Sequence, residues 1–307
     1  MTPAERPREA LKLFAIVALI LAGMGWGVGL PLGKVALREM DAAHMVLLRF
    51  AVAALAAAPF ALARADARAL FRSPAVLAAG VCYGAAFVMQ FEGLARVSVA
   101  MAALLVGAMP ALIAVCARLM GEPVSRLSWG GVAAATLGAA VIAGKPDGAG
   151  SPLGIALSLG SLVIFLGWVV ALRRAPEARS AMAMPAVVVV VGAITVLPIA
   201  WMLHGPPVFH ASPAAWGGII GQGLFSTLIA TAAWQYGSTR VGSATAGVFI
   251  NIEPLLGSAL GVAFFHDRLS LGLGLGGALI VAGSFAVVLG ERGHPATDMA
   301  HAPATPG

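Results

Sequence analysis

Asn251 and Glu253 stand beside Pro254 in the middle of a long apolar run. A charged side chain at the centre of a membrane helix costs about 2.5–3.5 kcal/mol on insertion scales. The Glu253 carboxylate must therefore be protonated, paired with another group or exposed to water. We interpret these two polar residues as candidates for a substrate or proton site. A structural hydrogen bond to a neighbouring helix is the alternative.

Proline recurs at the corresponding place of an earlier apolar run, as Pro110. Because proline has no N–H, the carbonyl four residues before it loses its helical partner. The freed carbonyls near Val106 and Ile250 are then available to line a polar site at mid-membrane or to form a hinge. A static kink is the alternative, but the presence of proline at the corresponding place of both apolar runs favours a site or hinge.

Two tryptophans and two glutamines complete the set of candidates for a binding cavity. Trp26 and Trp168 occupy comparable places in two apolar runs, and aromatic walls suit an apolar or aromatic substrate. A belt at the membrane surface or simple packing is the alternative for both. Gln222 is a further candidate, and Gln90 is one as well, although it stands near the end of its run where solvent exposure competes.

Arg49 is the basic residue that falls inside an apolar run rather than between runs. The sequence predicts that it pairs with a carboxylate such as Glu92 or reaches the headgroups with its long side chain. No GxSxG, HExxH or Walker A pattern is present, and Cys82 and Cys116 lie singly. We therefore expect no catalytic residues, no metal site and no cofactor.

Composition indicates which solvent surrounds these residues. The chain has 307 residues, 60% of them hydrophobic and 10% charged, whereas soluble domains carry about 25% charged residues. Lipid must therefore surround most of the chain. The net charge of +6 comes from basic residues in short loops, where they act as topology signals. Nucleic-acid binding is not expected.

Apolar runs of about 20 residues, enough for a helix to cross a core of roughly 30 Å, recur ten times along the chain. They are apolar at nearly every position, unlike the alternating strands of a membrane barrel, so we predict an all-α membrane protein. The predicted helices are Leu11–Leu30, Ala42–Leu62, Pro74–Leu94, Val97–Leu119, Leu127–Ala143, Leu153–Leu172, Ala181–Leu203, Ala214–Gly237, Ala244–Phe265 and Leu271–Leu289. Residues 291–307 are predicted to be a disordered cytoplasmic tail.

The basic residues also predict orientation. Thirteen Lys and Arg lie in segments on the side of the N-terminus and five on the other side, with Arg49 inside a run. This bias predicts that both termini are cytoplasmic.

An internal repeat divides the ten helices into two halves. Arg96 and Pro110 match Arg240 and Pro254 at one constant offset. The offset spans five helices, an odd number, so the second copy must enter the membrane from the opposite side. We therefore predict two inverted repeats of five helices, at residues 11–144 and 152–290. After a shift of one residue the matched pairs include Glu122 with Asp267, Ser125 with Ser270, Gly131 with Gly276 and Gly138 with Gly283.

Short motifs in a fixed order resemble the drug/metabolite transporter superfamily, in particular its EamA-type members with ten helices. The resemblance covers nearly all of residues 11–290. The motifs are Trp26-Gly27, Lys34, Arg49-Phe50, Gln90-Phe91-Glu92-Gly93-Leu94, Ala100 to Leu105, Met109-Pro110, Gly121-Glu122, Asn251-Ile252-Glu253-Pro254-Leu255-Leu256 and Gly283. One departure is His266-Asp267-Arg268, which lacks the usual Gly-Glu and leaves the role of this element open.

The resemblance implies a secondary transporter of the bacterial inner membrane that exports small metabolites, with amino acids as the leading substrate class. We expect alternating access around a cavity walled by the first, third, fourth, sixth, eighth and ninth helices. The expected partners are the small-molecule substrate and the lipid bilayer, and proton coupling stays an open question. A membrane channel or another non-transport membrane protein is the alternative, and an intramembrane enzyme is a more distant one.

Overall fold

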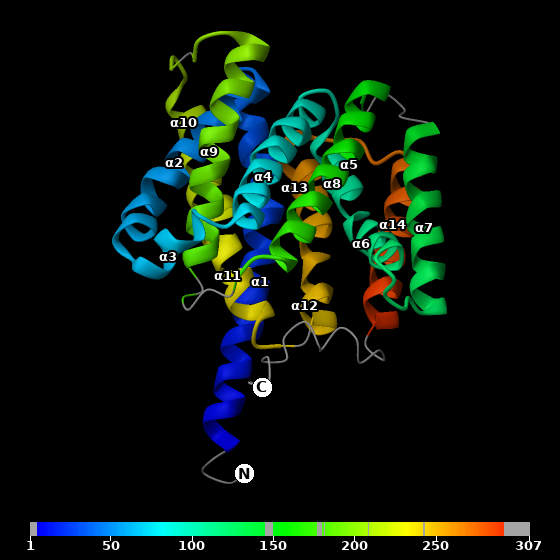
Figure 1. Cartoon of the computed structure of the whole chain (residues 1–307). Coiled ribbons are helices and arrows are strands. Elements are labelled where there is room, and N and C mark those ends of the chain that lie inside the picture. Colours follow the sequence, from blue (N-terminus) through cyan, green and yellow to red (C-terminus); the bar gives the residue numbers. More distant parts are fainter. Residues whose placement is uncertain are drawn as a thin grey trace.

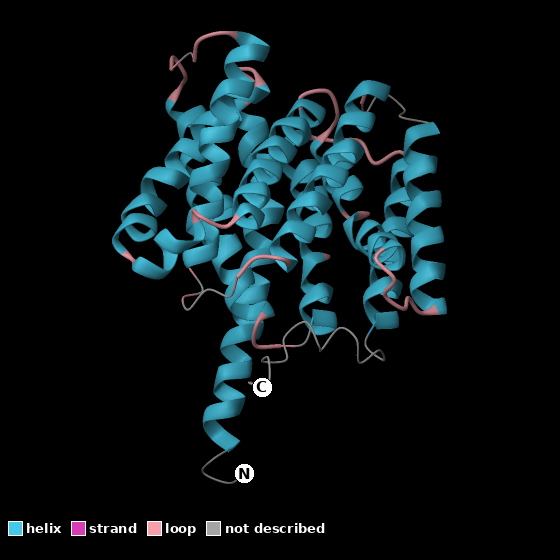
Figure 2. Ribbon diagram, viewed as in Figure 1, coloured by secondary structure: helices cyan, strands magenta, loops and turns pink. Residues whose placement is uncertain are grey.

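A computed structural model describes residues 5–144, 150–176, 180, 182–207, 209–241 and 243–291. Every named element within these ranges is a helix (Figure 2). The first half contains α1 (Glu5–Ala36), α2 (Ala42–Ala63), α3 (Ala65–Leu70), α4 (Pro74–Leu94), α5 (Val99–Val106), α6 (Met109–Leu119) and α7 (Arg126–Gly144). The second half contains α8 (Pro152–Arg173), α9 (Ala183–His204), α10 (Pro213–Gly221), the π-helical segment η1 (Gln222–Ile229), α11 (Ala230–Ser238), α12 (Ser243–Ile250), α13 (Ile252–Phe265) and α14 (Leu271–Glu291).

These elements make the predicted ten passes. Nine of the described passes are long and apolar enough to cross a membrane. The remaining one is α10–η1–α11, which carries the buried polar residues Gln222, Ser226, Thr227 and Thr231. The prediction of an all-α membrane protein is confirmed. The predicted tail lies outside the described residues except for Glu291, the last residue of α14.

Local structure departs from the predicted helices in five places. The helix α1 is longer than predicted and continues to Ala36, because the Lys34 ammonium donates to the carbonyls of Leu94 and Val97 at 2.6 and 2.8 Å. The short helix α3 was not predicted. The fourth and ninth passes are each broken into two helices, and the eighth contains the π-helical turn.

The inverted relation between the halves is visible where α7 meets α14. A Cβ atom at Gly131 would collide with the carbonyl of Gly283, and one at Gly138 would collide with that of Gly276. Residue numbers therefore increase along α7 in the direction in which they decrease along α14, so the two helices are antiparallel. Since the repeat equates Gly131 with Gly276 and Gly138 with Gly283, exchanging the halves turns each contact into the other. Glycine is required here because the two backbones touch.

The other helix pairs follow the same two-fold relation. Helix α2 packs on its repeat equivalent α9, and α5 packs on α13, so that the equivalent fourth and ninth passes also meet. Helix α4 packs on α8 just as α10, η1 and α11 pack on α1. Figure 1 shows that α1 begins and α14 ends on the same face of the bundle. We call this the N-terminal face and the other the distal face.

Candidate substrate cavity

A cavity of about 500 Å³ lies between the two halves. This volume falls within the usual range for small-molecule sites. Its walls include the predicted first, third, fourth, sixth, eighth and ninth passes, together with α2 and α14. Seven aromatic residues line it: Trp26, Tyr83, Phe87, Phe91, Phe165, Trp168 and Trp234. The polar lining consists of Arg49, Gln90, Glu122, Arg173, Gln222, Ser226, Gln235, Ser238, Thr239 and Glu253.

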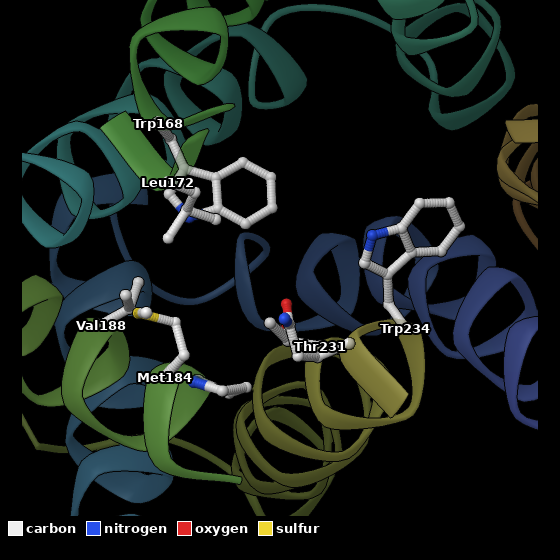
Figure 3. Close-up of a pocket in the computed structure, with 8 residues that line it drawn as sticks. Trp168, Leu172, Met184, Val188, Thr231 and Trp234 are labelled. Atoms are coloured by element: carbon white, nitrogen blue, oxygen red, sulfur yellow. The ribbon is translucent and has the colours of Figure 1, made fainter. Parts of the chain in front are cut away.

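A small recess opens beside this cavity between α8, α9 and α11. Figure 3 shows Trp168 and Trp234 reaching into it from different helices, above Met184 and Thr231. Trp168 and Trp234 also line the main cavity, so the recess extends its aromatic wall. The ring of Trp234 lies 5.4 Å from that of Trp26, and the ring of Trp168 lies 5.2 Å from that of Tyr83.

Most of the candidates named from sequence meet at the cavity. Six of them line it, and the other two, Asn251 and Pro254, do not. The six are Trp26, Gln90, Pro110, Trp168, Gln222 and Glu253.

The two helix breaks meet at the centre of the molecule. Pro110 and Pro254 stand just after the breaks in the fourth and ninth passes, and a Cβ atom at Gly107 would lie 3.4 Å from the Pro254 side chain. Asn251 fills the ninth-pass break, with its amide donating to the Val248 carbonyl at 3.4 Å. Its buried Oδ1 atom has no hydrogen-bond partner among the described residues. Asn251 therefore lies at the break in the ninth pass and is not among the residues that line the cavity.

Arg49 does not behave as the sequence predicted. Its side chain is only 1% exposed, so it does not reach the headgroups. Glu92 pairs instead with Arg96, at 2.6 Å. The Arg49 Nε donates to Thr227 Oγ1 at 2.9 Å, and the guanidinium lies 3.9 Å from the centre of the Phe87 ring. Both predicted alternatives for Arg49 were wrong, because α2 faces the cavity at this depth.

The π-helical segment explains how Thr227 reaches Arg49. Thr227 Oγ1 donates to the Gln222 carbonyl five residues earlier, at 3.0 Å, which is the spacing of a π turn. A Cβ atom at Gly223 would lie 2.7 Å from the Arg49 carbonyl, so glycine lets η1 approach α2 closely. One turn further on, Thr231 pairs with the Tyr83 hydroxyl at 3.1 Å. Sequence reasoning missed this set of contacts, since nothing in the local pattern distinguishes a π turn.

Gln222 and Trp168 carry polar atoms that the protein leaves unsatisfied. The Gln222 amide donates to the Gly29 carbonyl, but its Oε1 atom is buried without a partner among the described residues. The same holds for Trp168 Nε1. Buried polar atoms normally have partners. Two residues of the cavity wall therefore each carry a buried polar atom without a partner among the described residues.

Glu253 places a carboxyl group in the cavity wall. It lies in the first turn of α13, where the helix dipole favours a carboxylate. Its carboxylate makes no hydrogen bond or ion pair with a described residue. Arg49 and Glu253 thus line the same cavity without forming an ion pair with each other.

Contacts between the halves close the distal face. Asp267 Oδ2 accepts from the Ala100 N–H at 2.8 Å, at the start of α5. The altered motif His266-Asp267-Arg268 therefore has a structural role, because Asp267 caps a helix of the other half. Glu39 accepts from the Ser212 N–H at 2.7 Å and from its hydroxyl. These two hydrogen bonds lower the pKa of the Glu39 carboxyl.

Histidines add two further contacts on the distal face. His44 Nε2 lies 3.1 Å from the Gly205 carbonyl, and its Nδ1 lies 2.6 Å from Asp41. His204 Nε2 lies 3.2 Å from Glu92. These contacts again join α2 and α4 of the first half to α9 of the second.

The N-terminal face is open by comparison. The cavity lining extends to Glu122, Arg173, Ser238 and Thr239 at this end. Arg173 pairs with Glu122 at 2.8 Å across the halves, but the two side chains are 38% and 40% exposed. The cavity is therefore accessible from the N-terminal face and sealed at the distal face.

Comparison with known proteins agrees with this architecture. The model of the EamA-like transporter family matches residues 13–144 and 152–289. Because these two matches cover most of the chain, the protein belongs to the EamA-like transporter family. The exact bounds of the two halves, at 11–144 and 152–290, stay a prediction.

Individual relatives are more distant. The uncharacterized transporter YwfM of Bacillus subtilis (strain 168) is 28% identical over 148 residues, which is 48% of this chain and 49% of YwfM. The chain thus aligns with about half the length of this relative. A solved structure named "Crystal structure of protein" has a TM-score of 0.63 and 22% identity, over 92% of this chain and 98% of that one. At this identity the likeness shows a shared fold.

Proposed function

We propose that this protein is a secondary transporter that exports small metabolites, with amino acids as the substrate class, by alternating access. One observation carries the proposal. The cavity is walled by both inverted halves, open at one face and closed at the other by contacts between those halves. Rocking of the halves about the central cavity would expose it to each face in turn.

The lining of the cavity supports amino acids within the family's range of small molecules. It combines apolar aromatic walls with Arg49 and Glu253, while the other two charged residues of the lining, Glu122 and Arg173, pair with each other. An amino acid carries the complementary anion and cation on a compact body. Its side chain can then pack on the aromatic wall.

Charge distribution supports the location and direction. The bias of basic residues favours a cytoplasmic N-terminal face, and the family supports a location in the bacterial inner membrane. The cavity would then be open to the cytoplasm, where an exporter takes up its substrate.

Transport in proteoliposomes tests the proposal. Vesicles loaded with an unlabelled amino acid should accumulate the same radiolabelled amino acid transiently above equilibrium, with saturation at high concentration. A channel would let the label equilibrate without this overshoot, and an absence of any protein-dependent flux of amino acids would contradict the proposed substrate class.

Glu253→Gln should abolish the counterflow while leaving the melting temperature close to that of the wild type. Asn251→Ala should abolish it as well, by disturbing the ninth-pass break. Unchanged counterflow in both variants would remove these residues from the mechanism. Proton coupling is measured in the same vesicles with an imposed pH gradient. A coupled carrier responds in amplitude, and Glu253→Gln should remove that response.

A further inference from the structure

We propose that Arg49 is the receptor for the substrate carboxylate and Glu253 the receptor for its ammonium group, so that the cavity selects zwitterions by both charged ends. This inference deepens the proposed function and depends on it. It assigns a specificity role to Arg49, which sequence reasoning had treated as structural.

The contacts of Arg49 leave its two terminal nitrogens available to bind an anion. Its Nε is engaged by Thr227 at 2.9 Å, and its guanidinium lies on the face of Phe87 at 3.9 Å. Its two terminal nitrogens donate to no described residue, although the residue is 1% exposed and lines the cavity. The fork of N–H groups that Arg uses for bidentate binding of carboxylates is therefore free and fixed in direction.

A buried cation without a carboxylate partner is costly for the protein alone. The Phe87 face and the Thr227 hydroxyl offset part of that cost. A protein that needed Arg49 only for stability would pair it directly with an acid. Glu253 faces the same cavity, and yet the two side chains form no ion pair. The two groups lie on different halves, Arg49 on α2 and Glu253 on α13.

Charge balance identifies the class of ligand. A zwitterion completes both groups and leaves the occupied cavity neutral. A dicarboxylate or phosphate ester would satisfy Arg49 but place added negative charge beside Glu253. A simple amine would satisfy Glu253 and leave the Arg49 cation desolvated. Only a ligand with both ends therefore provides a partner of opposite charge for each of the two groups.

Neighbouring polar atoms agree with a ligand in this place. Gln222 is fully buried, and its unpartnered Oε1 atom sits in the wall of the same cavity. Its carbonyl is also the acceptor for Thr227, so Gln222 and Arg49 share one contact network.

Binding to purified protein in detergent tests the inference with three probes that differ only at their ends. These are L-phenylalanine, L-phenylalaninamide without the carboxylate, and N-acetyl-L-phenylalanine without the ammonium. We expect L-phenylalanine to raise the melting temperature of the wild type and to bind at least about tenfold more tightly than either derivative, since each lost end removes a charged hydrogen bond.

Substitution of Arg49 or of Glu253 should each remove the preference for one charged end of the probe. Arg49→Gln should lose the discrimination against the amide, and Glu253→Gln should lose the discrimination against the N-acetyl compound. Arg49→Lys keeps the charge without the fork and should fall between wild type and Arg49→Gln, which guards against a variant that fails to fold. Arg64→Gln and Asp66→Asn are matched controls, because that ion pair lies outside the cavity at an exposed turn.

Some results would overturn the inference. These are equal affinity for all three probes, no thermal shift with any of the twenty amino acids, or the same probe preference in Arg49→Gln as in the wild type. Saturable counterflow of another metabolite would in that case leave alternating access standing. Failure of counterflow for every metabolite, with binding preserved, would instead contradict the proposed function alone.

Discussion

The distal and N-terminal faces are built from equivalent parts of the two repeats, but the contacts between the halves differ at the two faces. At the distal face Asp267 caps α5 of the opposite half, and Glu39 engages Ser212. At the N-terminal face Glu122, the repeat equivalent of Asp267, forms an exposed ion pair with Arg173 instead of capping a helix. The same sequence element thus closes one face and leaves the other open. Inverted repeats permit this asymmetry because two states exchange the roles of the halves.

Locking the distal face should have the largest effect. A cleavable bifunctional thiol reagent joining Glu39→Cys to Ser212→Cys, with Cys82 and Cys116 replaced by serine, should abolish counterflow because the halves can no longer part. Reduction of the linker should restore it. The control pair is Arg64→Cys with Asp66→Cys, which lies within one half. Full counterflow after complete linking of the test pair would show that the distal contacts are not a gate.

Removing one distal contact should have an intermediate effect. Asp267→Ala deletes a helix cap worth about 1 kcal/mol, so we expect the distal face to open roughly fivefold more often. The measurement is the labelling rate of Leu30→Cys in the cavity by an impermeant thiol reagent applied from the distal side. Glu122→Ala is the matched variant at the repeat equivalent and should leave this rate nearly unchanged. Equal effects from both variants would erase the difference between the faces.

The ion pair on the N-terminal face should matter little. Arg173 and Glu122 are 38% and 40% exposed, and exposed pairs contribute about 0–1 kcal/mol. Arg173→Gln should therefore change the melting temperature only slightly and leave distal labelling of Leu30→Cys as it is. A loss of stability as large as that of Asp267→Ala would mean that both faces are held shut.

Acidification should produce the smallest change. The hydrogen bonds from Ser212 lower the pKa of Glu39, so this contact is intact at neutral pH and is lost as the pH falls through the lowered pKa. Distal labelling of Leu30→Cys should rise at acid pH, and Glu39→Gln should remove part of that rise. Asp41, His44, Glu92 and His204 on the same face stay in both proteins, so the difference reports Glu39.

Asp66 provides the control for this pH effect. Its pKa is also lowered, chiefly by a hydrogen bond from Arg64, but it lies far from the distal face in α3. Asp66→Asn should leave the pH dependence of labelling unchanged. An effect of Asp66→Asn as large as that of Glu39→Gln would assign the pH response to general stability.

The sequence by itself determined the passes, the repeat and the family. Runs of apolar residues fix helices in lipid one at a time, because each helix satisfies its own backbone. The paired arginines and prolines then indicated the inverted halves, since both pairs sit at one constant offset. Six of the eight candidate residues line the cavity, because polar side chains within membrane helices face the interior of the bundle or a cavity rather than lipid.

Only the tertiary structure decided which way Arg49 points, which residues partner it, and which face is sealed. Arg49 meets Thr227 and Phe87, which lie in other helices, and Thr227 is presented by a π turn with no local signature. Asn251 was assigned to the site from its type but lies at the helix break instead. The register between helices is set by packing across the whole bundle, and no periodicity within one helix contains that information.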